Sequence, residues 1–126
     1  LQVACPPGLR IHVHPILFQR AVSNLVDNAI KYSPNHTRVD LAVETAGADL
    51  LVLVADQGPG IAPEHQERIF ERFYRVDKSR SRKLGGTGLG LSIVRNVVQA
   101  HGGSVKVESA PGQGSRFLLR LPSAMA

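Results

Sequence analysis

One face of a predicted helix carries polar side chains that could hold a metal ion and phosphate. Residues 15–33 place apolar side chains at helical spacing, and Asn24, Asn28 and Lys31 fall within about 60° of one another on the opposite face. An amide oxygen can ligate a hard cation such as Mg²⁺, and a neighbouring lysine can meet phosphate oxygens. By itself, the row is more typical of an ordinary solvated helix face.

A carboxylate follows the most apolar segment of the chain. Leu50 to Ala55 is nearly continuous apolar, which is typical of a central strand, and Asp56 comes next, just before Gly58 and Gly60. A carboxylate there could accept a hydrogen bond from an adenine amino group, and the glycines would let the backbone approach the base. Aspartate before Gly-Pro is also a common turn former, so both interpretations stay open.

A glycine-rich segment, Gly85 to Gly90, leads into a second amphipathic helix, which we expect to be capped by Thr87 and to end near His101. A glycine-rich helix start offers unpaired amides and a favourable dipole to phosphate. The chain contains no Gly-Lys-Ser/Thr, and a basic loop precedes the glycines, so neither a Walker A motif nor a dinucleotide fingerprint is present. A plain glycine-rich linker would leave the helix that follows unexplained.

The positive charge is concentrated beside these glycines. The formal net charge is +5, and the segment 68–83 holds seven basic residues against two acidic ones, which accounts for the whole excess. We expect residues 76–86 to form a mobile loop that is better suited to closing over a polyphosphate than to lying along a duplex. A nucleic-acid binder is therefore the weakest alternative.

The composition is that of one soluble domain over residues 1–126, with 43% hydrophobic and 20% charged residues. No apolar run is long enough to span a bilayer, so we expect no membrane contact from this segment. The first residue is Leu1 and the only cysteine is Cys5. We read the chain as a cytoplasmic piece of a longer protein, which could itself be membrane-anchored.

The elements predicted around these motifs give an α+β fold. Strands are expected at 1–4 and 9–13, in a hairpin of 37–45 with 50–55, and at 104–109 and 115–121. Besides the two long helices, a short helix is expected around 66–70. Together they predict a two-layer α/β sandwich, with a mixed sheet of about five strands covered on one face by about three helices.

Five segments in this order resemble the N box, first glycine box, F box, second glycine box and last glycine box of the sensor histidine kinases. The resemblance runs from about Val13 to Leu121 and implies the Bergerat ATP-binding fold shared with gyrase, Hsp90 and MutL. The segments are Asn24-Leu-Val-Asp-Asn-Ala-Ile-Lys-Tyr-Ser33, Asp56-Gln-Gly-Pro-Gly-Ile61, Ile69-Phe-Glu-Arg-Phe-Tyr-Arg75, Gly86-Thr-Gly-Leu-Gly-Leu91 and Gly112-Gln-Gly-Ser-Arg-Phe117.

The resemblance implies ATP and Mg²⁺ as ligands and a catalytic set of Asn24, Asn28, Lys31 and Arg75. Asn28 matches the metal-ligating asparagine, and Asn24 supports it from one turn earlier. Lys31 and Arg75 match phosphate-contacting residues. Tyr32 matches a residue that packs near the nucleoside.

The remaining residues of the implied ATP site surround the base and the end of the triphosphate. Asp56 matches the adenine-reading aspartate, with Gly58, Gly60 and Ile61 in the same box beneath the base. Ser115 stands where the family often has threonine near the adenine. The implied phosphate-side lid and helix start comprise Thr87, Gly88, Leu89 and Gly90, and the implied lid anchors are Phe70 and Phe73.

Two departures from the family pattern limit what this segment can do. No H box surrounds any histidine of the chain, namely His12, His14, His36, His65 and His101, so we expect the phosphoacceptor to lie elsewhere. His12 and His14 with Cys5 lack a further ligand for a metal site. Hydrolytic relatives place a glutamate where this chain has Asn24, and an amide cannot take a proton from water.

The resemblance therefore implies the ATP-binding catalytic domain of a two-component sensor kinase. It would phosphorylate a histidine on an adjoining dimerisation domain and act indirectly on a response regulator. The isolated segment is expected to be monomeric and inactive, and the parent to be a homodimer. The alternatives are a protein-serine kinase of the anti-sigma type, an ATPase of the same superfamily, and a degenerate module that only docks partners.

Overall fold

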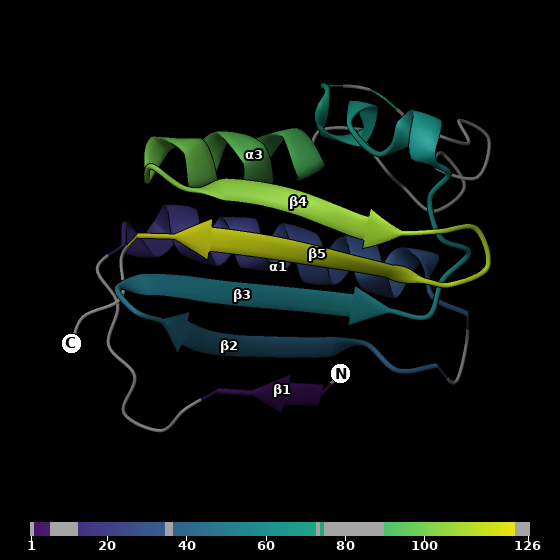
Figure 1. Ribbon diagram of the computed structural model, residues 1–126, viewed down its shortest axis with the longest axis horizontal. Helices are drawn as coiled ribbons and strands as arrows, with labels where there is room; N and C mark the ends of the chain where they lie inside the picture. Colours follow the sequence, from purple (N-terminus) through teal and green to yellow (C-terminus); the bar gives the residue numbers. More distant parts are fainter. Residues whose placement is uncertain (1, 6–12, 35–36, 73, 75–89, 123–126) are drawn as a thin grey trace.

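The computed structural model describes residues 2–5, 13–34, 37–72, 74 and 90–122. Its sheet has five strands in the order β1-β2-β3-β5-β4 (Figure 1). The strands are β1 (Gln2–Ala4), β2 (Asp40–Ala46), β3 (Asp49–Asp56), β4 (Ser104–Ser109) and β5 (Ser115–Leu121). β1 pairs parallel with β2, and every other neighbour is antiparallel, so the sheet is mixed, as predicted.

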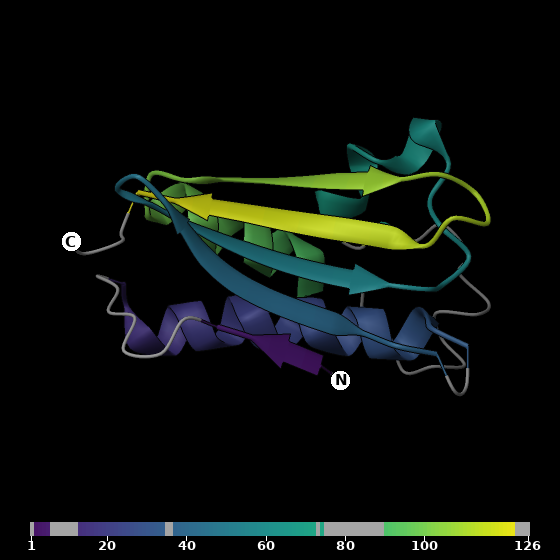
Figure 2. The same ribbon diagram turned by 60° about the horizontal axis from the view of Figure 1, so that its bottom comes forward.

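Two α-helices, α1 (Pro15–Tyr32) and α3 (Gly90–Ala100), lie side by side on one face of the sheet (Figures 1 and 2). This confirms the predicted two-layer sandwich. Pro15 opens α1, and Nδ1 of His14 accepts a hydrogen bond from the amide of Leu17 at 3.3 Å, so the helix start is capped. No helix among the described residues is long and apolar enough to cross a membrane.

The short helix predicted around 66–70 is not an α-helix. The chain instead forms two 3₁₀ turns, η1 (Pro63–His65) and η2 (Arg68–Phe70), beside the end of β4 in Figure 1. In these turns the amide of residue i+3 donates a hydrogen bond to the carbonyl of residue i, as from Gln66 to Pro63 and from Glu71 to Arg68. A segment this short makes too few hydrogen bonds to offset the entropy lost in nucleating an α-helix, so it forms the tighter 3₁₀ turn. The predicted strand at 9–13 lies largely outside the described residues.

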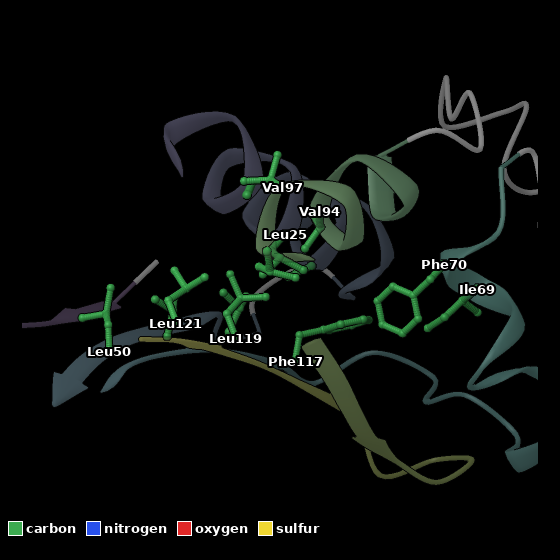
Figure 3. Packing of buried hydrophobic residues seen from close by; sticks show 14 of the residues in the cluster. Leu25, Leu50, Ile69, Phe70, Val94, Val97, Phe117, Leu119 and Leu121 are labelled. Atoms are coloured by element: carbon green, nitrogen blue, oxygen red, sulfur yellow. The ribbon is translucent and has the colours of Figure 1, made fainter. Parts of the chain in front are cut away.

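The core fills the space between the sheet and the two α-helices. α1 contributes the fully buried Ala21, Leu25 and Ala29, and the side chains of β3 and β5 converge on them (Figure 3). Phe70 of η2 meets Phe117 of β5 edge to face, with ring centres 6.2 Å apart. This contact joins the η2 turn to the core, because edge-to-face aromatic pairs are favourable beyond the area they bury.

Candidate functional site

The apolar inner face of the sheet ends in a row of three polar side chains. Side chains of β3 alternate, so Asp56 follows the buried Leu50, Val52 and Val54 on the core face. Ser115 lies opposite Asp56 in the β3–β5 ladder, and Ser109 of β4 lies opposite Ser115. The register therefore places a carboxylate and two hydroxyls beside one another where the core gives way to solvent.

Asp56 occupies a half-buried position with two backbone donors. Its Oδ1 accepts a hydrogen bond from the amide of Gly58 at 2.8 Å, and the amide of Ser115 also donates to its carboxylate. Burial raises the pKa of Asp56 above its usual value, and the two amide hydrogen bonds oppose that rise. A carboxylate kept partly out of water, with lone pairs to spare, is suited to accept a further hydrogen bond from a ligand.

Two glycines allow the loop after Asp56 to pack against the rest of the protein. A Cβ at Gly58 would lie 2.8 Å from the carbonyl oxygen of Tyr32 and 2.9 Å from Oδ1 of Asp56. A Cβ at Gly60, where φ is +79°, would lie 2.0 Å from the carbonyl oxygen of Ala110. The structure therefore gives a packing reason for glycine at both positions.

Ser109 is the hydrogen-bonding centre of this end of the sheet. Its hydroxyl accepts from the amide of Ile61 at 2.8 Å, donates to the carbonyl of Gly114 at 2.6 Å, and lies 3.0 Å from Oγ of Ser115. Gln66 adds two bonds from Nε2, to the carbonyls of Ile61 and Ser109. The loop that carries Asp56 is thus fixed to the ends of β4 and β5.

The polar face of α1 reaches the same end of the molecule. The C-terminal end of α1, the ends of β3 and β4 and the starts of β5 and α3 lie together at the right of Figure 1. Asn28 is half-buried and Lys31 is exposed on this helix. Nδ2 of Asn24 donates to the carbonyl of Gly90 at 3.5 Å, so Asn24 links α1 to the first residue of α3.

Several predicted site residues lie outside the described part of the chain: Arg75, Thr87, Gly88, Leu89 and the proposed anchor Phe73. The basic loop expected at 76–86 lies there too. Among the described residues, the structure brings the half-buried carboxylate, Ser115 and the C-terminal end of α1 to one end of the sheet. Tyr32 joins them through its carbonyl, which is adjacent to Gly58.

Sequence reasoning missed Ser109 and Gln66. Both lie outside the recognised boxes, and their importance depends on which strands pair. The alternation of β4 was available, because Val105, Val107 and Ser109 share one face, but the pairing of β4 with β5 in the register that puts Ser109 opposite Ser115 was not. The only sequence signal for Ser109 was its place as a polar residue at the end of a pattern of alternating apolar residues.

The donor set fits a nucleotide with a magnesium ion carried mainly by its phosphates. No group of three or more His, Cys, Asp or Glu side chains able to hold a metal occurs within the described ranges. Asn28, which is half-buried on α1, offers one amide oxygen. A cation that needs six oxygens would therefore take most of them from phosphate and water, which is how Mg²⁺ usually binds.

The chain matches known proteins over nearly its whole length. A family model described as histidine kinase-, DNA gyrase B-, and HSP90-like ATPase matches residues 13–125. The sensor-like histidine kinase SenX3 of Mycolicibacterium smegmatis is 50% identical over 117 residues, which are 93% of this chain and 30% of that protein. The sensor histidine kinase CpxA of Escherichia coli is 43% identical over 123 residues, 97% of this chain and 26% of that protein.

Solved structures agree with the fold. The mycobacterial sensor histidine kinase MprB superposes with a TM-score of 0.84 and 34% identity, over 98% of this chain and 82% of that one. Full-length ShkA, solved in complex with AMPPNP, gives a TM-score of 0.83 and 33% identity, over 99% of this chain and 26% of that one. The chain spans less than a third of the length of the curated relatives SenX3 and CpxA.

Proposed function

We propose a role in ATP-dependent phosphoryl transfer, because this chain belongs to the histidine kinase-, DNA gyrase B- and HSP90-like ATPase family and matches the ATP-binding catalytic domain of sensor histidine kinases. It binds Mg-ATP and donates the γ-phosphate to a histidine on an adjoining dimerisation domain. The observation that carries the proposal is the half-buried carboxylate of Asp56 at the end of β3, where the carbonyl of Tyr32, the last residue of α1, lies against Gly58 of the following loop.

The base end of the site is built around Asp56. Its carboxylate accepts from the exocyclic amino group of adenine, while Gly58, Gly60 and Ile61 form the loop beneath the base and Tyr32 packs near the nucleoside. The amides of Gly58 and Ser115 already hold the carboxylate in place, so little reorganisation is needed on binding. Ser115 lies beside it on the next strand.

The phosphate end is built on α1 and on the start of α3. Asn28 ligates Mg²⁺ through its amide oxygen, and Lys31 and Arg75 contact phosphate oxygens. Thr87, Gly88, Leu89 and Gly90 complete the site with backbone amides at the helix start. Bound Mg²⁺ supplies charge neutralisation on the phosphate oxygens. The residues of the chain orient the γ-phosphate and offset its charge, which is the main source of catalysis in phosphoryl transfer.

Transfer to a protein side chain is favoured over hydrolysis by the residue at position 24. An asparagine has no basic group to accept a proton from water, and here its amide nitrogen is engaged with the carbonyl of Gly90. In the proposed reaction a nitrogen of the acceptor histidine forms a bond to the γ-phosphorus as the bond to the β-γ bridging oxygen breaks. ADP leaves, and no water is activated.

The wider setting of the reaction is part of the proposal. Residues 1–126 form one catalytic domain of a longer, dimeric sensor kinase, and this domain works in the cytoplasm. Its direct partner is the dimerisation domain that carries the phosphoacceptor histidine, and the phosphate then passes to a response regulator. Support comes from the sensor kinases to which the chain is similar, since each is much longer than this segment.

Replacing Asn28 tests the metal-bound site. Asn28→Ala should weaken Mg-ATP binding by at least about tenfold, since it removes a ligand of the cation that links protein to phosphate. Calorimetry with excess EDTA should show the wild type and the variant binding ATP equally, because no metal is present to be ligated.

Ser23→Ala is the matched control, because Ser23 is exposed on the same helix. It should leave binding unchanged with and without Mg²⁺. An equal loss for Asn28→Ala in both conditions would refute metal ligation by this residue.

A further inference from the structure

The hydroxyl of Ser109 has its full complement of hydrogen bonds. A serine hydroxyl carries one proton and two lone pairs. The carbonyl of Gly114, at 2.6 Å, can only accept, so it takes the proton of Ser109. The amide of Ile61, at 2.8 Å, can only donate, so it occupies one lone pair. One lone pair of Ser109 remains.

That remaining lone pair fixes the direction of the neighbouring hydroxyl. Oγ of Ser115 lies 3.0 Å from Oγ of Ser109, and Ser109 has no proton left to give. Ser115 must therefore donate its own proton to Ser109. Ser115 then has only lone pairs to offer to anything else, so it faces its surroundings as an acceptor.

Hydrogen bonds from neighbouring residues hold Ser109 and Ser115 in this arrangement. The amide N–H of Ile61 bonds to Ser109, and its carbonyl accepts from Nε2 of Gln66 at 2.9 Å, so the peptide groups around Ile61 are fixed. Nε2 of Gln66 also donates to the backbone carbonyl of Ser109 at 2.8 Å. Ser115 is 6% exposed, so solvent water has little access to compete with Ser109 for its proton. The polarity of Ser115 is therefore a property of the folded domain.

We propose that Ser109 is a positioning residue for nucleobase selection, because it holds the Ser115 hydroxyl as an acceptor next to the carboxylate of Asp56. Two neighbouring acceptors favour a purine whose 6-position carries an amino donor and disfavour one whose 6-position carries an oxo acceptor. The inference rests on the proposed function, in that it assigns the base-binding end to this row. It adds a residue outside the recognised boxes that acts through Ser115.

The test compares ATP with ITP, which differ at the 6-position and the adjacent ring nitrogen. The wild type should prefer ATP by at least about tenfold, because a polar site rejects a ligand that leaves its buried groups unpaired. Ser109→Ala leaves the Ser115 hydroxyl free to turn and donate to the oxo group. The ratio of the ITP and ATP dissociation constants should then fall by about threefold or more.

Two further variants separate positioning from general damage. Ser115→Ala should lower the ratio as well, and the double variant should match Ser115→Ala alone, because Ser109 acts through Ser115. Val105→Ala, on the same face of β4 and away from the row, should lower the melting temperature and leave the ratio unchanged.

The outcomes are distinguishable. A Ser109→Ala variant that weakens both nucleotides by the same factor would make Ser109 merely structural. A Ser115→Ala variant with an unchanged ratio would overturn the proposal even if Ser109→Ala failed to fold. Failure of the wild type to bind either nucleotide would remove the proposed function itself, whereas tight binding without selectivity would remove only the role of the serines.

Discussion

At the scale of single residues, Asp56 combines a cost in stability with its proposed role in binding. Burial raises the pKa of its carboxyl, so the native state holds a proton at Asp56 more readily than the unfolded chain does. The ionised carboxylate therefore costs stability at neutral pH, and that cost is relieved as the pH falls through the raised pKa. A group kept in such a position is typical of binding sites.

Asp56→Asn should consequently separate stability from binding. At neutral pH the variant should be at least as stable as the wild type in urea unfolding, and its advantage should shrink as the pH is lowered. Its ATP affinity should be about tenfold lower, because the charged acceptor for the adenine amino group is lost. Wild-type affinity should fall as Asp56 is protonated, whereas the affinity of the variant should follow a flatter curve.

Gln57→Ala is the matched control, since its side chain is exposed next to Asp56. A strong loss of stability in Asp56→Asn at neutral pH, with unchanged ATP affinity, would make Asp56 a structural residue only.

The sequence identified candidate site residues where a motif carries them locally. Asp56 was identified because an apolar strand, a carboxylate and glycines follow one another within a few positions. Ser109 was not, because its importance arises from the pairing of β4 with β5, which no short segment encodes. Nor could the raised pKa of Asp56 be inferred, since it depends on how the surrounding chain buries the carboxyl.

At the scale of elements, the alternation of apolar and polar residues, with Gly and Pro between the segments, predicted the strands closely. The predicted 104–109 and 115–121 coincide with β4 and β5, and the predicted hairpin is β2 with β3, joined by Gly47 and Ala48. The length and the amphipathic pattern of its segment likewise predicted α1. Where a short helix was predicted around 66–70, the chain forms 3₁₀ turns, and their side chains make tertiary contacts: Gln66 donates to the carbonyl of Ser109 at the end of β4, and Phe70 packs against Phe117 of β5.

His101 joins the two helices at the end opposite the site. Its Nε2 accepts from the amide of His14 at 3.0 Å, and its Nδ1 lies 2.8 Å from the carbonyl of Val97. The first partner can only donate and the second can only accept, so Nε2 acts as the acceptor and Nδ1 as the donor in this link. The C-terminal end of α3 is thereby tied to the N-terminal end of α1.

His101→Ala should lower the free energy of unfolding by about 0.5–1.5 kcal/mol, the usual worth of a hydrogen bond. ATP affinity should stay unchanged, because the link is remote from Asp56. Urea unfolding and calorimetry measure the two quantities, with Gln99→Ala on the exposed face of α3 as the control. A marked change in ATP affinity would show that the two ends of the domain are coupled.

At the scale of the whole molecule, the two layers bring distant segments to one end. The C-terminal end of α1, the end of β3 and the start of α3 are far apart along the chain and lie at one end of the folded sandwich. The order of the boxes predicted this meeting through resemblance, whereas periodicity alone predicted only the layers. Asparagine at position 24, bonded to the carbonyl of Gly90, is the feature that separates transfer from hydrolysis in our account.

The most direct test follows phosphate from ATP labelled at the γ-position. Residues 1–126 alone should release it at a rate near background, because Asn24 has no basic group to activate water. Addition of the helical dimerisation domain on a separate chain should label a histidine of that domain, with an acid-labile and base-stable product. Asn28→Ala should abolish the labelling. Steady hydrolysis by residues 1–126 alone, lost in Asn28→Ala, would contradict the account and make this chain an ATPase.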